Sequence, residues 1–389
     1  MRSRLIALVV MMLVIGACSD APSAATAFAP AAPLLDEATS ASVSDASPVS
    51  SVRWNRKAMA LFRVRGGSAG RPNAYLSLAQ YRAVLAANDA QHGTTRPSLA
   101  GAAAGASVVV LKQYYPLDAA AIDAELEAQR AVATLGTERN TDFDAGEAIG
   151  RAIGVAVLAF AATDNAGLTS PGVPPVGAGF WVSSGAPIVR GGLGARPFFL
   201  KSASELRLPP PPAFGSPAFL AALAEVRALS DSRTPEQVAI SQKWVPFSGV
   251  VFNGIATDLI VKYHRSELEA AQILAYANTA GVDATLACFD TKFAYWFIRP
   301  TQADPGITLA VGLPNHPSYP SGHSCETGAW QGVLSDAFPS ERAMLAETAE
   351  EASMSRVNGG LHYRFDGEGG LSIGRSAARL ALERRGLER

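Results

Sequence analysis

The sequence of 389 residues is poor in cysteine, in charged side chains and in long apolar runs. Three cysteines are too few to build a disulfide scaffold. The 33 basic and 34 acidic residues give a formal net charge of −1, which excludes a basic nucleic-acid-binding protein and an acidic tail protein. The sequence also lacks the motifs of Walker A loops, EF-hands, HExxH metalloproteases and CxxC pairs. Hydrophobic residues make up 48 % and supply ample apolar surface for a core.

An apolar run near the N-terminus covers residues 5–15 and follows two arginines. Its length suits the hydrophobic region of a signal peptide and is too short to cross a bilayer. The segment 15–18 reads Ile-Gly-Ala-Cys and resembles a bacterial lipobox, in which Cys18 is lipidated and becomes the first mature residue. We therefore predict a lipoprotein-type signal peptide at residues 1–17, the alternative being an ordinary cleaved signal with an incidental cysteine.

Small and polar residues dominate the segment 18–50, which has few large side chains. Such a segment cannot bury enough surface to offset the entropy lost on ordering, so we predict a flexible tether. No later run reaches 18 apolar residues, so we expect a soluble body that contacts a membrane only through a lipid anchor. Export then places the protein in the bacterial cell envelope, either lipid-anchored or periplasmic or extracellular.

From residue 51 onward, apolar residues recur mainly at helical spacing and strand alternation is nearly absent. We predict an all-α body over 51–389, with an N-terminal helical half at about 51–170 and a C-terminal catalytic half at 213–389. The Pro- and Gly-rich segment 171–212 should form an ordered, irregular connection between two helical bundles. Helices are expected from Trp54 onward and at 76–88, 117–135, 144–163, 217–230, 234–244, 251–278, 280–298, 325–338, 340–355 and 368–385.

Two cations stand seven residues apart in an apolar segment, Lys292 and Arg299. Seven steps of about 100° return almost to the same face of a helix, so both side chains point to one place. Pro300 then ends the helix. Exposed cations whose stems lie along the surface are the alternative, but the apolar neighbours favour a buried pair that needs an anion.

Histidine is scarce, with five residues in all, and two of them bracket the segment His316–His323. Pro320, Ser321 and Gly322 indicate a turn into a helix, whose N-terminal N–H groups and dipole favour an anion. Glycine lets the backbone approach such a ligand closely. His323 follows directly and is suited to give or take a proton near neutral pH.

A third segment carries Arg356 near the end of a helix, followed by His362 and Asp366. If the chain is helical there, Asp366 lies on the same face as His362 and orients its imidazole. A helix cap before Gly367 is the alternative role for this carboxylate. The three segments together provide three cations, two histidines, a serine and a glycine amide, which suit a tetrahedral or trigonal-bipyramidal oxyanion.

These segments resemble the three-part signature of the type 2 phosphatidic acid phosphatase (PAP2) and vanadium-dependent haloperoxidase superfamily. The signature reads Lys-x6-Arg-Pro, then Pro-Ser-Gly-His, then Ser-Arg-x5-His-x3-Asp, and every defined position is present between residues 292 and 366. Each part alone is weak, whereas the three in order are highly specific. The resemblance implies an all-α fold with the active site in the C-terminal bundle.

The resemblance also implies roles for several defined positions of the signature. His362 would bond to vanadium in a haloperoxidase or attack phosphorus in a phosphatase. His323 would be the acid–base partner, and Lys292 would also polarise bound peroxide. The residues implied to hold the oxyanion are Lys292, Arg299, Ser321, Gly322 and Arg356.

The haloperoxidase branch is favoured by His316, which stands where chloroperoxidases carry phenylalanine, and by the segment 361–371, which resembles bacterial vanadium haloperoxidase-like proteins. The long helical region before Lys292 also exceeds what small acid phosphatases need. We therefore expect vanadate as cofactor and hydrogen peroxide, a halide (bromide or iodide rather than chloride) and an organic acceptor as partners. A homodimer is left open, and no nucleic-acid partner is expected.

Two other functions are kept as alternatives. One is an exported PAP2-type acid phosphatase that hydrolyses phosphomonoesters through a phosphohistidine, with phosphate as the substrate group. The other is a non-catalytic surface lipoprotein that binds an oxyanion.

Two further predictions concern residues around the site. Trp181, Trp296, Tyr319 and His316 are candidates for the substrate entrance, with core packing as the alternative for Trp296. Cys288 lies one helical turn before Lys292, and Cys325 lies two residues after His323. We predict that these two cysteines lie close enough for a disulfide, which an exported location permits, and whether the bond forms is left open.

Overall fold

The protein is described by a computed structural model that covers residues 49–66, 70–92, 96–135, 138–167, 171–246 and 248–387. These residues form helices and irregular loops without a named strand, which confirms the predicted all-α fold. An isolated antiparallel bridge joins Phe180 to Phe297. The predicted signal peptide, the lipidation site Cys18 and nearly all of the tether lie outside the described residues.

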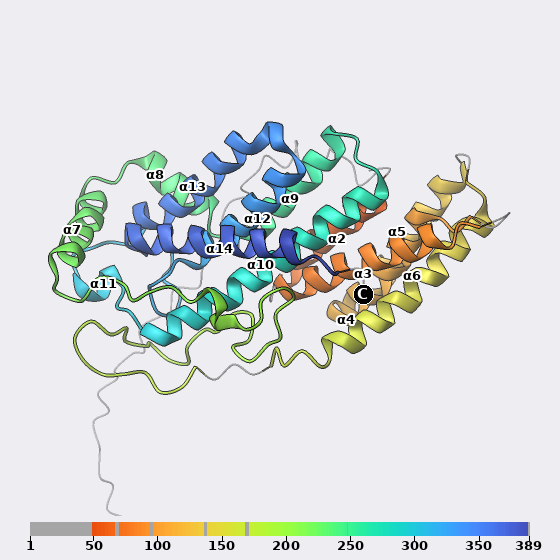
Figure 1. Ribbon diagram of the computed structural model, residues 1–389. Coiled ribbons are helices and arrows are strands. Elements are labelled where there is room, and N and C mark those ends of the chain that lie inside the picture. Colours follow the sequence, from red (N-terminus) through yellow and green to blue (C-terminus); the bar gives the residue numbers. More distant parts are fainter. Residues whose placement is uncertain are drawn as a thin grey trace, which may run out of the picture.

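The helices form an elongated body, with α4–α6 at one end and α7, α8 and α11 at the other (Figure 1). The helices before the irregular connection are α2 (Ser50–Arg65), α3 (Gly70–Asp89), α4 (Leu99–Tyr114), η1 (Pro116–Asp118), α5 (Ala119–Leu135) and α6 (Asn140–Ala161). Those after it are α7 (Pro217–Asp231), α8 (Pro235–Lys243), α9 (Ser248–Lys262), α10 (Glu267–Tyr295), α11 (Pro300–Ala303), α12 (Gly322–Ala337), η3 (Pro339–Glu341), α13 (Arg342–Asn358) and α14 (Arg364–Arg384).

The predicted break near residue 279 is wrong, because α10 runs without interruption for 29 residues. The break lies earlier, between α9 and α10, where His264 has a φ of 48° and Ser266 caps the next helix. The Ser266 hydroxyl accepts from the Glu269 amide, and the Glu269 carboxylate accepts from the Ser266 amide. This capping box sets the start of α10, although the apolar periodicity continues across the break and predicts one helix there.

Helix α4 has no counterpart among the predicted helices, because its Ala- and Gly-rich sequence lacks the spacing of large apolar residues. Ser98 caps its first turn by accepting a hydrogen bond of 2.9 Å from the Gly101 amide. The helix packs closely on α6, since a methyl group on Gly105 would lie 2.3 Å from the carbonyl oxygen of Glu147. Small residues therefore let the backbones of α4 and α6 approach closely. The high helix propensity of alanine favours α4 although the helix lacks an amphipathic stripe.

Residues from both predicted halves of the chain pack into one hydrophobic cluster that reaches from Val52 to Leu387. Helix α10 contributes to it along most of its length, because it is buried on all sides rather than along one stripe. Among the described residues, no single helix has both the length and the hydropathy of a membrane span. Helices α8 and α9 reach these values only as a pair, bent by 79° at the break between them.

The segment 171–212 follows an irregular path along the helices and contains the short 3-10 helix η2 (Ala203–Leu206) (Figure 1). Asp283 of α10 holds it in place. The buried carboxylate accepts backbone hydrogen bonds of 2.8, 2.7 and 3.1 Å from Phe198, Phe199 and Leu200. Burial raises the pKa of Asp283 to about 6, and these three bonds act in the opposite direction by favouring the charged form.

Replacing Asp283 by alanine should destabilise the protein, because three backbone N–H groups would lose their acceptor. An unsatisfied buried donor costs about 1–3 kcal/mol, so we expect the thermal unfolding midpoint to fall by several degrees in differential scanning calorimetry. Asp258→Ala, whose side chain is 70 % exposed, is the matched control and should change the midpoint little. Equal losses in the two variants would contradict the anchoring role of Asp283.

Candidate active site

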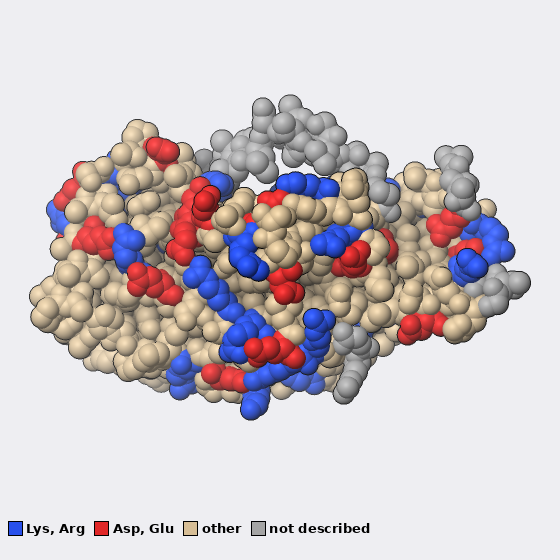
Figure 2. All heavy atoms as spheres, turned by 45° about the horizontal axis from the view of Figure 1, so that its top comes forward, with Lys and Arg blue, Asp and Glu red and all other residues tan. Residues whose placement is uncertain are grey.

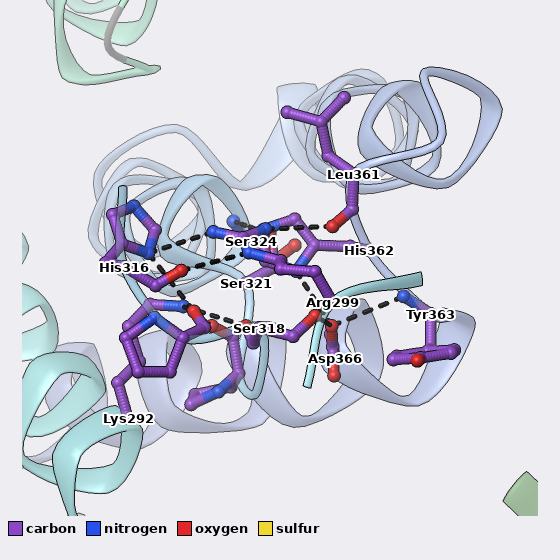
Figure 3. Close-up of polar contacts among 12 residues, drawn as sticks. Lys292, Arg299, His316, Ser318, Ser321, Ser324, Leu361, His362, Tyr363 and Asp366 are labelled. Carbon is purple, nitrogen blue, oxygen red and sulfur yellow. Dashed lines mark hydrogen bonds and ion pairs between the residues drawn. The ribbon is translucent and has the colours of Figure 1, made fainter. Parts of the chain in front are cut away.

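The three sequence segments converge at one place in the C-terminal half of the molecule (Figure 3). Each reaches it from a helix end, where backbone groups and side chains are free to point inward. Lys292 lies in the last turn of α10, Arg299 precedes α11, the loop 316–321 leads into α12, Arg356 lies in the last turn of α13, and His362 and Asp366 flank the start of α14.

The position of the proton on His362 is fixed by two neighbours. Its Nε2 atom lies 3.0 Å from an Arg299 guanidinium nitrogen, and its Nδ1 atom lies 2.8 Å from an Asp366 carboxylate oxygen. A guanidinium has only donors, so Nε2 is the accepting nitrogen and the proton on Nδ1 is donated to Asp366. The imidazole therefore carries its lone pair on Nε2, the form that bonds to a metal centre or attacks an electrophile.

Asp366 is fully buried and combines the two roles considered for it. Besides the bond from His362, the carboxylate accepts from the Ser318 hydroxyl at 2.5 Å and from the Tyr363 amide at 3.3 Å. The bond from Tyr363 caps α14, so the carboxylate both orients the imidazole and caps the helix. Burial raises the pKa of Asp366 to about 6, which leaves the group ionised at neutral pH.

Lys292 holds the loop that leads into α12. Its ammonium group donates to the carbonyls of Pro317 and Ser318 at 2.8 Å each and to the carbonyl of Pro320. These bonds use all three N–H donors of the side chain. Burial lowers the pKa of Lys292 to about 8. Its predicted contact with an oxyanion stays a prediction, since reaching one would require the release of at least one carbonyl.

Arg299 is also fully buried and links the second segment to the third. It donates to the His316 carbonyl and to the Nδ1 atom of His316, both at 3.0 Å. It also donates to the Leu361 carbonyl at 2.8 Å, besides its bond to His362. Burial lowers the pKa of Arg299 to about 10, so the guanidinium remains charged at neutral pH.

A cavity of about 280 Å³ opens beside His362, and we call it the oxyanion cavity. Arg356 lines this cavity although the residue is only 2 % exposed. It donates to the Ser355 hydroxyl at 2.9 Å and to the Ser241 carbonyl, while its Nη1 atom has no hydrogen-bond partner among the described residues. Burial lowers the pKa of Arg356 to about 10, so the group stays charged. A buried cation with an unused donor favours an anion beside it.

Gly322 lines the oxyanion cavity at the N-terminus of α12. A methyl group on Gly322 would meet no heavy atom within 4 Å, so this face of the helix start is open. Ser321 caps the helix by accepting a bond of 3.4 Å from the Ser324 amide. The Ser321 side chain is buried and does not line the cavity, so its predicted contact with an oxyanion stays a prediction.

His316 and His323 also line the oxyanion cavity. The Nε2 atom of His323 donates to the Trp244 carbonyl at 2.8 Å, because that oxygen is an acceptor. Burial holds the pKa of both imidazoles well below the ordinary value, and the charges of Lys292 and Arg356 lower those of His316 and His323, respectively. Both rings are therefore neutral at neutral pH, whereas the sequence predicts that His323 gives or takes a proton near that pH.

The aromatic candidates for the substrate entrance do not line the oxyanion cavity. Trp296 ends α10 in the left-handed conformation and stacks on Trp181, with ring centroids 6.2 Å apart. Both are buried, so core packing is the role of Trp296. Tyr319 donates to the Pro209 carbonyl at 3.1 Å and helps to hold the irregular connection.

Cys288 and Cys325 are free thiols in the structure, which answers the question of the disulfide that the sequence left open. Their proximity is confirmed, since burial and the bond to the Cys288 thiol raise the pKa of Cys325. Both side chains are fully buried where α10 packs on α12. In that position they fill space as small apolar groups, which requires no covalent link.

Sequence reasoning missed Arg190, which comes from the irregular segment 171–212 and lines the oxyanion cavity. Its charge lowers the pKa of His316 and of His323. No motif surrounds Arg190, so only the folded path of the connection reveals it. Ser318 was also missed as a partner of Asp366, although it lies inside the segment His316–His323.

Asp366→Asn should move the proton of His362 from Nδ1 to Nε2, if the amide group of asparagine donates to Nδ1. Loss of such an orienting partner typically weakens metal binding by about 10- to 100-fold, so we expect a comparable loss of vanadate affinity. Equilibrium dialysis with ⁵¹V NMR measures it. Ser318→Ala, which removes a different partner of the same carboxylate, should weaken binding much less. Unchanged affinity in a folded Asp366→Asn protein would contradict the tautomer argument.

Comparison with known proteins agrees with this geometry. Residues 271–386 match the family model of the PAP2 superfamily. No curated protein sequence matches the chain at the same standard of significance. Among solved structures, a bacterial vanadium-dependent iodoperoxidase is similar with a TM-score of 0.72 and 22 % identity, over 85 % of this chain and 94 % of that one.

Two further solved structures with similar folds are of bacterial vanadium-dependent chloroperoxidase, one apo-type and one holo-type. The apo form gives a TM-score of 0.65 and 16 % identity over 82 % of this chain and 94 % of that one. The holo form gives a TM-score of 0.60 and 14 % identity over 88 % of this chain and 95 % of that one. The matched region contains all three segments, and the resemblance inferred from the sequence is confirmed: residues 271–386 match the PAP2 superfamily model, and the chain has the fold of the vanadium haloperoxidases.

Proposed function

We propose that the protein is a vanadate-dependent haloperoxidase that oxidises bromide or iodide, in preference to chloride, with hydrogen peroxide to hypohalous acid. The observation that carries the proposal is the lone pair of His362 Nε2, fixed between Arg299 and Asp366 beside a cavity lined by cations. The fold supports the same choice, because the similar solved structures are an iodoperoxidase and a chloroperoxidase. The preference against chloride rests on His316, which lines the cavity where phenylalanine is expected in chloroperoxidases.

The residues at the oxyanion cavity fit vanadate. Arg356 offers an unused N–H donor, and the open face of Gly322 leaves room at a helix N-terminus for an oxyanion. Lys292, Arg299 and Arg356 outnumber the single carboxylate of Asp366, so the surroundings are positively charged. His362 Nε2 would bond to the metal centre once Arg299 turns its donor toward an oxyanion oxygen.

Bound vanadate would supply a Lewis-acid centre that makes peroxide electrophilic toward a halide. Asp366 keeps the proton on Nδ1 of His362 and so preserves the basic lone pair on Nε2. Arg356 and the N-terminus of α12 stabilise negative charge in the cavity. His323 is neutral and lines the cavity, and its imidazole is the group proposed to take a proton from hydrogen peroxide.

We further propose an exported protein of the bacterial cell envelope, lipid-anchored at Cys18, with an organic acceptor as its second substrate. A nucleic-acid partner is not proposed. On the face shown in Figure 2, Lys and Arg side chains are interspersed with Asp and Glu rather than gathered in one basic surface.

Phosphatase activity is the second candidate, because the same lone pair of His362 is suited to attack phosphorus. The two activities are separated by assays on one preparation. A haloperoxidase brominates monochlorodimedone or oxidises iodide only when vanadate and peroxide are both present. A phosphatase releases nitrophenol from p-nitrophenyl phosphate and is inhibited by vanadate. Phosphate release without halide oxidation would overturn the proposal.

His362→Ala should abolish halide oxidation, since no other neutral imidazole beside the cavity has its lone pair oriented by a carboxylate among the described residues. The protein should remain folded by circular dichroism. His264→Ala, at the start of the α9–α10 connection, is the control and should keep full activity. Retained activity in His362→Ala would support the non-catalytic alternative.

Gly322→Ala tests whether the open face at the start of α12 receives the oxyanion. The methyl group meets no protein atom within 4 Å, and alanine favours helix, so stability should not fall. A bound oxyanion would be crowded, at a cost of about 1–3 kcal/mol, equivalent to roughly a tenfold or greater loss of affinity. Vanadate titration of both proteins measures the change, and equal affinities would show that the oxyanion binds elsewhere.

A further inference from the structure

A second cavity of about 460 Å³ adjoins the oxyanion cavity, and we call it the inner chamber. Helices α3, α9, α10 and α12 and the irregular connection supply its walls. Arg190 and Thr285 line both cavities, so the two meet at these residues. The volume is in the range that holds a small organic molecule, whereas vanadate, peroxide and halide require only the smaller cavity.

The inner chamber contains a buried carboxyl group whose hydrogen bonding is incomplete. Glu326 on α12 is 4 % exposed, and its Oε2 atom accepts from the Ser248 hydroxyl at 2.7 Å and the Gly249 amide at 2.8 Å. The Oε1 atom has no hydrogen-bond partner among the described residues. Burial raises the pKa of Glu326 to about 7, while the charge of Arg190 acts in the opposite direction. An acceptor is thus available on the chamber wall.

Trp330 provides a donor beside this acceptor. It lies four residues after Glu326 on the same face of α12, and both line the inner chamber. Trp330 is 2 % exposed, and in the described part of the chain its indole N–H has no hydrogen-bond acceptor. Buried indole N–H groups normally have a partner, so one is expected from a bound molecule or from water.

Two glycines on the facing helices keep these groups accessible. A methyl group on Gly249 would lie 2.5 Å from Glu326 Oε1, and one on Gly281 would lie 3.2 Å from Trp330 Nε1. Any larger residue at either position would cover the acceptor or the donor. The space in front of the carboxyl and the indole thus depends on Gly249 in α9 and Gly281 in α10.

We propose that the inner chamber binds the organic acceptor of the halogenation reaction as a neutral hydroxy-aromatic compound, whose hydroxyl donates to Glu326 Oε1 and accepts from Trp330 Nε1. The proposal deepens the function proposed above and rests on it for the reaction, although not for the binding. A hydroxyl is the group that both donates and accepts at one atom. An ammonium ion is disfavoured by Arg190 and Arg71 on the wall, and a carboxylate is disfavoured by Glu326 itself.

The arrangement also suits the chemistry that follows. A carboxylate that accepts the hydroxyl proton raises the electron density of the ring, which increases its reactivity toward an electrophile. Hypohalous acid formed in the oxyanion cavity would enter past Arg190 and Thr285. A ring carbon–halogen bond then forms as the oxygen–halogen bond breaks, and the ring proton leaves with the released hydroxide as water.

Binding is tested on the full-length protein without vanadate, peroxide or halide, by isothermal titration calorimetry with 4-bromophenol. The O-methylated 4-bromoanisole, which has no donor, is the matched ligand. Wild-type protein should bind the phenol about tenfold more tightly than the anisole, because the anisole cannot donate a hydrogen bond to Glu326. Glu326→Gln should lower the affinity for the phenol and leave the affinity for the anisole nearly unchanged. Glu350→Gln, a change at an exposed carboxylate on α13, should affect neither ligand.

A second variant keeps the test decisive if Glu326→Gln does not fold. Gly281→Ala favours helix and places a methyl group over the indole N–H, which either ligand can use as a donor, so it should lower the affinity for both the phenol and the anisole. Equal affinities for phenol and anisole in the wild-type protein, or unchanged phenol affinity in a folded variant, would overturn the proposal. Selective phenol binding by a protein that oxidises no halide would leave the chamber intact and refute the haloperoxidase function instead.

Discussion

The site depends on the need to satisfy buried positive charge. Lys292 and Arg299 are fully buried, and most of their donors are used by backbone carbonyls of the loop 316–321 and of Leu361. Each bond offsets part of the desolvation cost of the cations and at the same time fixes the loop that begins α12. The charges of Lys292 and Arg299 therefore hold the cavity walls in place. Arg356 retains a donor that is available to a ligand.

The same constraint decides the protonation of the histidines. His362 lies between a group that only donates and a group that only accepts, so one tautomer is selected without any ligand. The neighbouring cations and burial keep His316 and His323 neutral as well. A lone pair and proton acceptors therefore exist in a region that is strongly positive, which is the combination required for binding an oxyanion and for handling protons around it.

The sequence predicted the all-α fold, the convergence of the three segments and the His362–Asp366 contact, because spacing along helices and turn residues are local properties. It did not predict α4, whose small residues carry no periodic signal, or the continuity of α10 across residue 279. Arg190 and the inner chamber were beyond its reach, since both arise from the irregular connection packing on helices far away in the chain. The direction of the Lys292 donors was missed because the loop carbonyls that accept them have no sequence signature.

Helix α10 contributes residues to three regions from one uninterrupted helix. Asp283 anchors the irregular connection, Gly281 and Thr285 line the inner chamber, and Lys292 holds the oxyanion loop. Each residue added to or removed from a helix rotates everything beyond it by about 100°. An insertion or deletion between Gly281 and Lys292 would thus turn one set of contacts away from its target while leaving the other in place. The register of this stretch is fixed by geometry, so evolutionary change in length must be confined to the loops that join the helices.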